Sequence, residues 1–197
     1  MIKDKEYLIK QIQGLTPFNE EERKNKELLL RCLEKEEDVF SRKNTLAHFT
    51  ASSWIVNKNR DKVLLCFHNI YNSWSWLGGH CDSNMDCLEV AIKEAKEESG
   101  LEDFKCIYDG IFSLESLCVN SHIKRGEVVS SHIHLNVTYL LEADDTKPLK
   151  IKEDENKGLM WAPLEAIYSL SNELWFVEHV YKKLNQKLYR LIEEKKI

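Results

Sequence analysis

Three glutamates near the middle of the chain have the spacing of a metal-binding set. Glu94, Glu97 and Glu98 stand at positions i, i+3 and i+4 of a segment expected to be helical, so their carboxylates project within about a 100° sector. Like charges this close repel one another, and a divalent cation would reverse that repulsion. Carboxylate oxygens suit Mg²⁺ or Mn²⁺, which fill their other positions with water and substrate phosphate oxygens. The alternative is a solvated helix face, since Lys93 and Lys96 alternate with the glutamates.

A helix from about residue 87 to 99 must present these carboxylates. Asp86 is its expected N-cap, Glu89 stands where it would complete a capping box, and Gly100 is the expected C-terminal stop. The apolar stripe of this helix is centred roughly 110° around its axis from the glutamates, which places the carboxylates at the border of the buried face. Four residues form the stripe: Leu88, Ala91, Ile92 and Ala95.

Composition restricts the class of partner. The chain has 197 residues with 28 basic and 33 acidic side chains, a net charge of -5, which fits one ordinary domain with an appendage. Mild acidity argues against binding a nucleic-acid polymer, which usually requires a basic face. No stretch approaches the ~20 apolar residues of a membrane span, and charges interrupt the N-terminal apolar runs. We therefore expect a cytoplasmic protein without membrane contact.

The remaining elements are expected to build a sheet with flanking helices. An amphipathic helix is expected from Asn19 to about Phe40, and a last helix carries one apolar stripe formed by Val177, Tyr181, Leu184, Leu188 and Leu191. Two β-rich runs, 48–57 and 62–71, suggest a hairpin or meander, and a turn-rich stretch at 74–86 leads into the helix of the glutamates. Further β-rich runs at 104–117 and 128–141 are joined by a loop containing Lys124, Arg125 and Gly126. After them, a polar loop at 142–158 precedes a short strand and a helix that starts at Pro163.

The segment from Gly79 to Leu101 resembles the Nudix box, G-x5-E-x7-R-E-U-x-E-E-x-G-U, where U is a bulky aliphatic residue. Six positions match, and Ala95 is a smaller residue at an aliphatic position; the matches are Gly79, Glu94, Glu97, Glu98, Gly100 and Leu101. Met85 replaces the first glutamate, and Lys93 replaces the arginine, keeping the charge without the planar five-donor fork.

The resemblance to MutT-type Nudix domains runs from His48 to the end of the chain. It implies an α/β fold, a Nudix-like α/β/α sandwich around a mixed β-sheet, with an N-terminal helical extension at 1–45 and the Nudix hydrolase domain at 46–197. The implied activity is divalent-metal-dependent hydrolysis of a pyrophosphate bond in a nucleoside diphosphate linked to another moiety, by attack of water at phosphorus.

The resemblance also implies roles for individual glutamates. Glu94, Glu97 and Glu98 would bind Mg²⁺ or Mn²⁺ and belong to the catalytic set. The general base would be Glu94 or a glutamate on the later polar loop, for which Glu155 is the first choice. By sequence, Glu153 and Glu115 are equally available for that distal role.

Aromatic and polar side chains outside the box are candidates for substrate binding. Trp74 and Trp76 could stack on a base, or they could pack in the core or a hairpin. His132, His134 and Asn136 alternate along a strand and point to one face of the sheet, which is either the substrate cleft or a wet surface.

The sequence alone also allows other roles for individual residues and for the protein. His80 could contact phosphate or metal. Met85, Lys93 and the N-terminal helix also fit a non-catalytic Nudix-fold nucleotide-binding or sensor module. In either case the expected partner is a small nucleotide-type diphosphate, and the two amphipathic helices would allow a homodimer.

Overall fold

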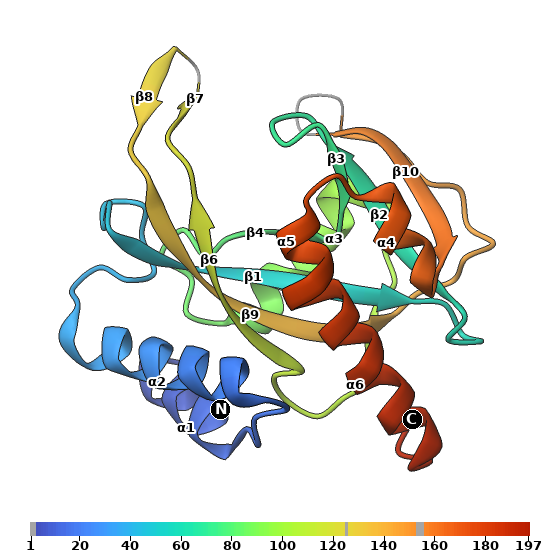
Figure 1. The fold of residues 1–197 in the computed structure, drawn as a ribbon, viewed down its shortest axis with the longest axis horizontal. Coiled ribbons are helices and arrows are strands. Elements are labelled where there is room, and N and C mark those ends of the chain that lie inside the picture. The colour runs from blue at the N-terminus through green and yellow to red at the C-terminus, as the bar shows by residue number, and fades with distance from the viewer. Residues whose placement is uncertain (1–2, 125, 153–155) are drawn as a thin grey trace.

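A mixed β-sheet lies between helices on its two sides (Figure 1). The structure is a computed structural model, and it describes residues 3–124, 126–152 and 156–197. The main path of the sheet has the order β10-β2-β1-β9-β5, with β3 paired to β2, β4 to β1, and β6 to β9. The strands of this sheet are β1 (Ala47–Val56), β2 (Lys62–His68), β3 (Ser73–Ser75), β4 (Leu77–His80), β5 (Lys105–Cys106), β6 (Ser113–Val119), β9 (His132–Glu142) and β10 (Asn156–Pro163).

The long strands β1 and β9 form the centre of the sheet. They run parallel over ten residue pairs, from Ala47 opposite Ile133 to Val56 opposite Glu142, whereas their other neighbours are antiparallel. The predicted connection between the first two β-rich runs is confirmed, because β1 and β2 pair antiparallel at Val56 and Val63. A separate ribbon of β7 (His122–Lys124) and β8 (Glu127–Val129) projects away from the body (Figure 1).

Helices cover both sides of the sheet, which confirms the expected α/β/α sandwich. In Figure 1, α3 (Cys87–Ser99) lies behind the sheet and α6 (Lys182–Glu193) in front of it. The last helical run also contains α5 (Leu174–Phe176) and the π-helical turn η2 (Val177–Tyr181), and it follows η1 (Leu164–Ala166) and α4 (Ile167–Leu170). All five residues of the predicted C-terminal stripe are buried, in the core on the α6 side: Val177, Tyr181, Leu184, Leu188 and Leu191.

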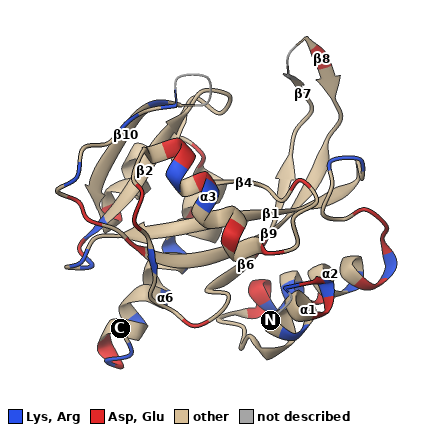
Figure 2. Cartoon of the chain, turned by 180° about the vertical axis from the view of Figure 1, so that it is seen from behind, with Lys and Arg blue, Asp and Glu red and all other residues tan. Residues whose placement is uncertain are grey.

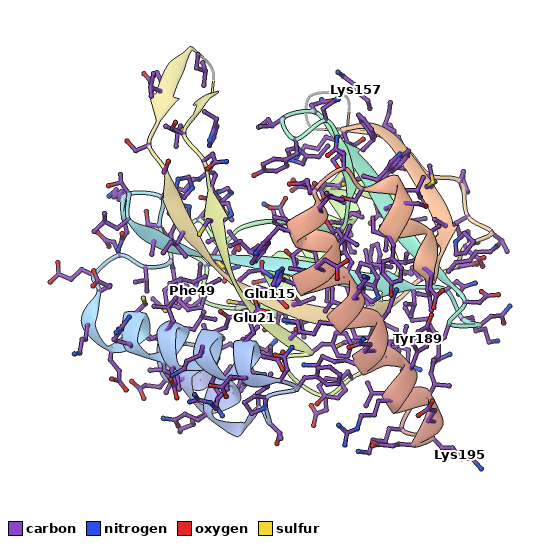
Figure 3. All side chains as sticks on the ribbon, in the orientation of Figure 1. Glu21, Phe49, Glu115, Lys157, Tyr189 and Lys195 are labelled. Atoms are coloured by element: carbon purple, nitrogen blue, oxygen red, sulfur yellow. The ribbon has the colours of Figure 1, made fainter. Side chains whose placement is uncertain are left out.

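Two helices precede β1, namely α1 (Lys5–Gly14) and α2 (Glu20–Lys35). The sequence predicted the second, and Asn19 is its N-cap, although the helix ends at Lys35 rather than near Phe40. The first was missed. Both pack into the core that contains Phe49 of β1, a residue labelled in Figure 3. The division of the chain between residues 45 and 46 stays a prediction.

The turn-rich stretch at 74–86 was predicted wrongly in part, because it holds the end of β3 and all of β4. Its serines and glycines carry no strand preference of their own, and they become strand residues by pairing with β2 and β1. No helix within the described residues has the length and apolar character that crossing a bilayer requires.

Candidate metal and substrate site

Helix α3 has the bounds that the sequence predicts, and its ends explain why. The Asp86 side chain accepts a hydrogen bond from the Glu89 backbone N–H at 3.2 Å, and Gly100 ends the helix with φ of 72°. In a complete capping box, the Glu89 carboxylate would accept the backbone N–H of Asp86. Here Asn84 Oδ1 accepts that N–H instead, and the Glu89 carboxylate accepts from Asn84 Nδ2. These contacts connect the loop to the first turn of the helix.

The three glutamates of α3 share one side of the helix but differ in exposure. Glu98 is buried, with 3% of its surface exposed, and its Oε2 accepts the backbone N–H of Gly78 at 3.0 Å. The side chain of Glu94 is 15% exposed and that of Glu97 is 40% exposed. The set therefore runs from the sheet outward to solvent, as expected for carboxylates at the border of a buried face.

Gly79 makes room for one of these carboxylates. A Cβ at Gly79 would lie 2.5 Å from Cδ of Glu94 and 2.7 Å from its Oε2, closer than real contacts allow. The missing side chain thus lets Glu94 lie against β4. The carboxylate oxygens of Glu94 are held beside Gly79 of β4, and oxygen ligands of this kind are the ones that hard divalent cations such as Mg²⁺ or Mn²⁺ prefer.

Two lysines neutralise part of the carboxylate charge. Lys93 Nζ lies 3.4 Å from Glu97 Oε1 and 3.8 Å from Glu94 Oε1, so the residue at the arginine position of the box still faces the glutamates. Lys152 Nζ donates to Glu97 Oε2 at 3.2 Å, and this hydrogen bond is the main reason that the pKa of Glu97 is lowered. Figure 2 shows α3 from its solvent side with acidic and basic residues following one another along it.

Histidines gather on the other side of β4. Rings of His48, His80 and His134 lie with centroids 4.8 to 5.1 Å apart, and one ring nitrogen of each lies within 4.8 Å of the others. Burial, followed by the neighbouring histidines, lowers the pKa of His134 to about 2, and burial lowers that of His48. These two imidazoles are therefore neutral at physiological pH. Sequence reasoning placed His80 and His134 in the site region and missed His48.

Asn136 lies on the same face of β9 as His134, but it is fully buried in a polar network. Its Oδ1 accepts from Thr50 and Ser52, both at 2.9 Å, and its Nδ2 donates to Glu115 Oε2 at 2.9 Å and to Thr138 Oγ1 at 3.1 Å. Protein groups thus use its full hydrogen-bonding capacity. Direct binding of substrate by this side chain stays an untested prediction.

Glu115 pairs with Lys183 of α6 at 2.9 Å, and both side chains are buried. Figure 3 labels Glu115 in the interior of the molecule. The other two candidates for the distal base, Glu153 and Glu155, lie outside the described residues.

The two tryptophans at the start of the loop differ in their surroundings. Trp76 is 8% exposed and contacts Tyr181 edge to face within the α6-side core. Trp74 is half-buried and packs edge to face on Phe67, with its ring also facing Gly158. Core packing, one of the two roles that the sequence allows, accounts for Trp76, whereas Trp74 is only partly buried at the edge of the same core.

Comparison with known proteins identifies the class. The NUDIX domain family model matches residues 47–184, which is more than half of the chain. The chain belongs to this family and is a Nudix-type pyrophosphohydrolase, an enzyme that acts on acid anhydrides. No curated protein matches it significantly.

Solved structures support the same fold. A C. elegans Ap4A hydrolase in a binary complex has a TM-score of 0.51 at 18% identity and covers 72% of this chain and 98% of its own. RenU, a Nudix hydrolase from M. smegmatis, has a TM-score of 0.51 at 13% identity over 73% of this chain and 87% of its own. The E. coli dihydroneopterin triphosphate pyrophosphohydrolase has a TM-score of 0.50 at 14% identity over 68% and 94%. At these identities the likeness concerns the fold.

Proposed function

We propose that this protein is a Mg²⁺- or Mn²⁺-dependent hydrolase that cleaves a pyrophosphate bond in a nucleoside diphosphate linked to another moiety, by attack of water at phosphorus. The observation that supports it most is the placement of Glu94 and Glu98 against the glycines of β4, with Gly78 N–H holding Glu98 at 3.0 Å. The chain is acidic overall, so an anionic substrate needs a source of positive charge at this place.

Glu94, Glu97 and Glu98 would hold the ion. A divalent ion bound there supplies positive charge to the phosphate oxygens and lowers the pKa of a bound water. Gly78 fixes the position of the Glu98 carboxylate, and Lys93 and Lys152 orient Glu97. Glu94 is the local choice of general base, and Glu155 is the distal one.

Substrate recognition would use side chains outside the box. The half-buried ring of Trp74 can stack on a nucleobase, an interaction of roughly 1–3 kcal/mol per base. His134 of β9 is the proposed contact for another part of the substrate. A small nucleotide-type diphosphate is therefore the proposed partner.

The test is turnover of a substrate panel with Mg²⁺ or Mn²⁺ and identification of the products. The panel holds nucleoside triphosphates, nucleotide sugars, ADP-ribose and dinucleoside polyphosphates, and the reaction is run in ¹⁸O-labelled water. We expect hydrolysis of at least one compound, with the label in a phosphate product and loss of metal-dependent turnover in Glu97→Gln and Glu98→Gln.

Glu102→Gln is the matched control, because Glu102 follows α3 at its C-terminal end, is 81% exposed and pairs only loosely with Lys96 at 3.6 Å. It should turn over like the unmodified protein. Comparing Glu94→Gln with Glu155→Gln locates the base: if Glu155 is the base, Glu155→Gln lowers kcat while metal affinity is retained, whereas Glu94→Gln lowers metal affinity as well because Glu94 is a proposed ligand. The proposal fails if no compound is hydrolysed, or if turnover survives in both Glu97→Gln and Glu98→Gln.

A further inference from the structure

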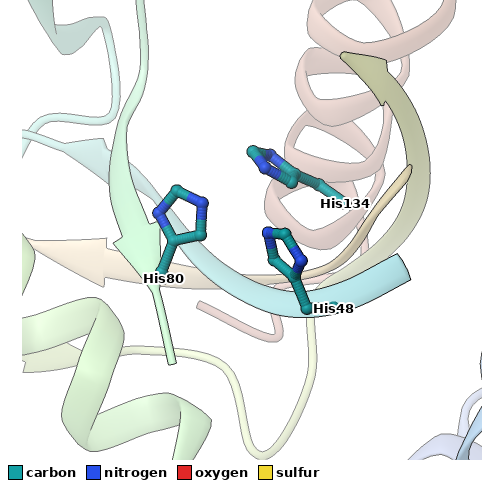
Figure 4. Close-up of side chains that lie close together, drawn as sticks. All are labelled: His48, His80 and His134. Carbon is teal, nitrogen blue, oxygen red and sulfur yellow. The ribbon is translucent and has the colours of Figure 1, made fainter. Parts of the chain in front are cut away.

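Three neighbouring strands each contribute one histidine to a single face of the sheet. His48 of β1 lies directly opposite His134 of β9, and His80 of β4 lies opposite Thr50, two residues along from His48. Because side chains alternate along a strand, all three project to the same side. Figure 4 shows the three rings turned toward a common space. One nitrogen of each ring lies within 4.8 Å of the other two.

Hydrogen bonding fixes which nitrogen of His48 can bind a ligand. Its Nδ1 lies 2.9 Å from the carbonyl oxygen of Asn44, and since a carbonyl only accepts, Nδ1 carries the proton. Nε2 therefore has a free electron pair. This atom is buried and has no hydrogen-bond partner among the described residues, while the whole residue is 4% exposed. A buried acceptor left without a donor is an exception among folded proteins, and a bound ion is one of its recognised explanations.

His132 orients His134 in the same way. His132 Nδ1 lies 2.8 Å from the carbonyl oxygen of Ser130, so in the neutral ring Nε2 is the acceptor. That Nε2 lies 3.1 Å from Nε2 of His134, which must then be the donor. His134 consequently has its electron pair on Nδ1. A ligating histidine that donates its other N–H to a fixed acceptor is the usual arrangement around metal ions.

The donor set selects the kind of ion. Three imidazoles suit Zn²⁺ and related first-row transition metals, whereas Mg²⁺ prefers oxygen. Tetrahedral Zn²⁺ with Zn–N bonds of about 2.0–2.1 Å needs nitrogens roughly 3.3 Å apart. The nitrogens lie within 4.8 Å of one another, so they must approach by up to about 1.5 Å. His80 and His134 are less buried than His48, which is 4% exposed. Three protein ligands would leave a fourth position for water or an anion.

We propose that His48, His80 and His134 form a binding site for a divalent transition-metal ion, Zn²⁺ first, separate from the glutamates of α3. The two sets lie on opposite sides of β4, since the Gly79 position faces Glu94 and the next residue, His80, faces His48. The proposal does not depend on the hydrolytic reaction. His132 is a positioning residue in this site.

Metal binding by the untagged full-length protein tests the site directly. The protein is stripped with a chelator and titrated with Co²⁺, whose visible absorption reports tetrahedral nitrogen coordination, and Zn²⁺ affinity is measured by competition with a chelating dye. With excess Mg²⁺ present to occupy the glutamates of α3, we expect one Co²⁺ or Zn²⁺ ion per chain. His80→Gln and His134→Gln should each weaken Zn²⁺ binding by about 10–100-fold or more and remove the Co²⁺ spectrum.

Two variants serve as controls. His179→Gln makes the same substitution at an exposed histidine that pairs with Glu21 away from the cluster, and Glu98→Gln alters the carboxylate set. Both should bind Zn²⁺ as the unmodified protein does. Circular dichroism and melting of the metal-free variants confirm folding, which matters most for His48→Gln because His48 is buried.

The proposal is overturned if the stripped protein binds no Co²⁺ or Zn²⁺ at one per chain, or if His80→Gln and His134→Gln both keep full affinity. It is also overturned if Glu98→Gln, rather than the histidine variants, removes the Zn²⁺. That last result would place the ion at the carboxylates of α3.

Discussion

Gly79→Ala should abolish most activity while leaving the fold intact. The new Cβ would lie 2.5 Å from Cδ of Glu94, where ordinary contacts begin near 3.4 Å, so the carboxylate must move by about 1 Å. A misplacement of about 1 Å can cost ~100-fold in rate, or about 2.7 kcal/mol of transition-state stabilisation. The atoms displaced are the end of a flexible side chain, and Gly79 does not have a left-handed φ. We therefore expect the free energy of unfolding to change by less than about 1 kcal/mol.

Gly78→Ala is the matched control one residue earlier. Its Cβ would meet backbone atoms, with the Ala51 carbonyl oxygen at 2.6 Å and Ser52 Cα at 2.7 Å. Backbone cannot move aside as a side chain can, so this variant should lose about 1–3 kcal/mol of stability. Urea denaturation and steady-state kinetics with Mg²⁺ separate the two effects.

A double variant tests whether Gly79→Ala acts through Glu94. If it does, Gly79→Ala combined with Glu94→Gln should be barely worse than Glu94→Gln alone, because both remove the same interaction. The reasoning is refuted if Gly79→Ala keeps full activity while Glu94→Gln is inactive. Additive losses in the double variant, or equal destabilisation by the two glycine variants, would refute it as well.

Three further predictions concern residues outside the glutamate set. Burial raises the pKa of Glu22, but the ammonium groups of Lys187 and Lys183 outweigh this effect and leave the pKa below its ordinary value. Glu22→Gln should therefore lower the free energy of unfolding by about 3–5 kcal/mol, measured by urea denaturation at pH 7. Since the ionised carboxylate stabilises the fold above its unfolded pKa, the difference should shrink as pH falls below about 4. Trp74→Ala should raise KM for a nucleotide with little loss of stability, whereas Trp76→Ala should cost about 3–5 kcal/mol in a melt. Met85→Glu should leave activity unchanged or raise it, and a large loss in the kinetic assay would show that Met85 has a positive role.

The sequence predicted α3 to the residue because its boundaries are local. Asp86 caps the first turn with its own side chain, and Gly100 adopts the left-handed conformation that ends a helix. Helix α1 has similar local signals. The Asp4 side chain accepts the Tyr7 N–H at the start of this helix, and the two fully buried residues of the helix, Leu8 and Ile12, are four residues apart.

Strand β4 and the histidine cluster could not be found this way, because tertiary pairing creates them. Gly78 and Gly79 favour turns by type, and only the ladder with β1 makes them strand residues. His48, His80 and His134 lie dozens of residues apart and form no metal-binding spacing in the sequence. The alternation of His132 and His134 along one strand predicted that they share a face of the sheet. Placing His48 on that face requires the register between β1 and β9, in which His48 lies opposite His134.

The alternation of β4 has a chemical consequence for the enzyme. Gly79 faces Glu94 and the neighbouring His80 faces His48, so one short strand separates an oxygen donor set from a nitrogen donor set. The two proposed sets are therefore separated although they are close along the chain, and by donor type the carboxylates would prefer Mg²⁺ or Mn²⁺ and the imidazoles Zn²⁺. A substitution on one face should leave ion binding on the other face unchanged, unless it moves the backbone of β4. Gly78→Ala is the substitution that does so, because its Cβ pushes on the backbone of β1. Among the variants described, only Gly78→Ala should weaken the binding of both ions.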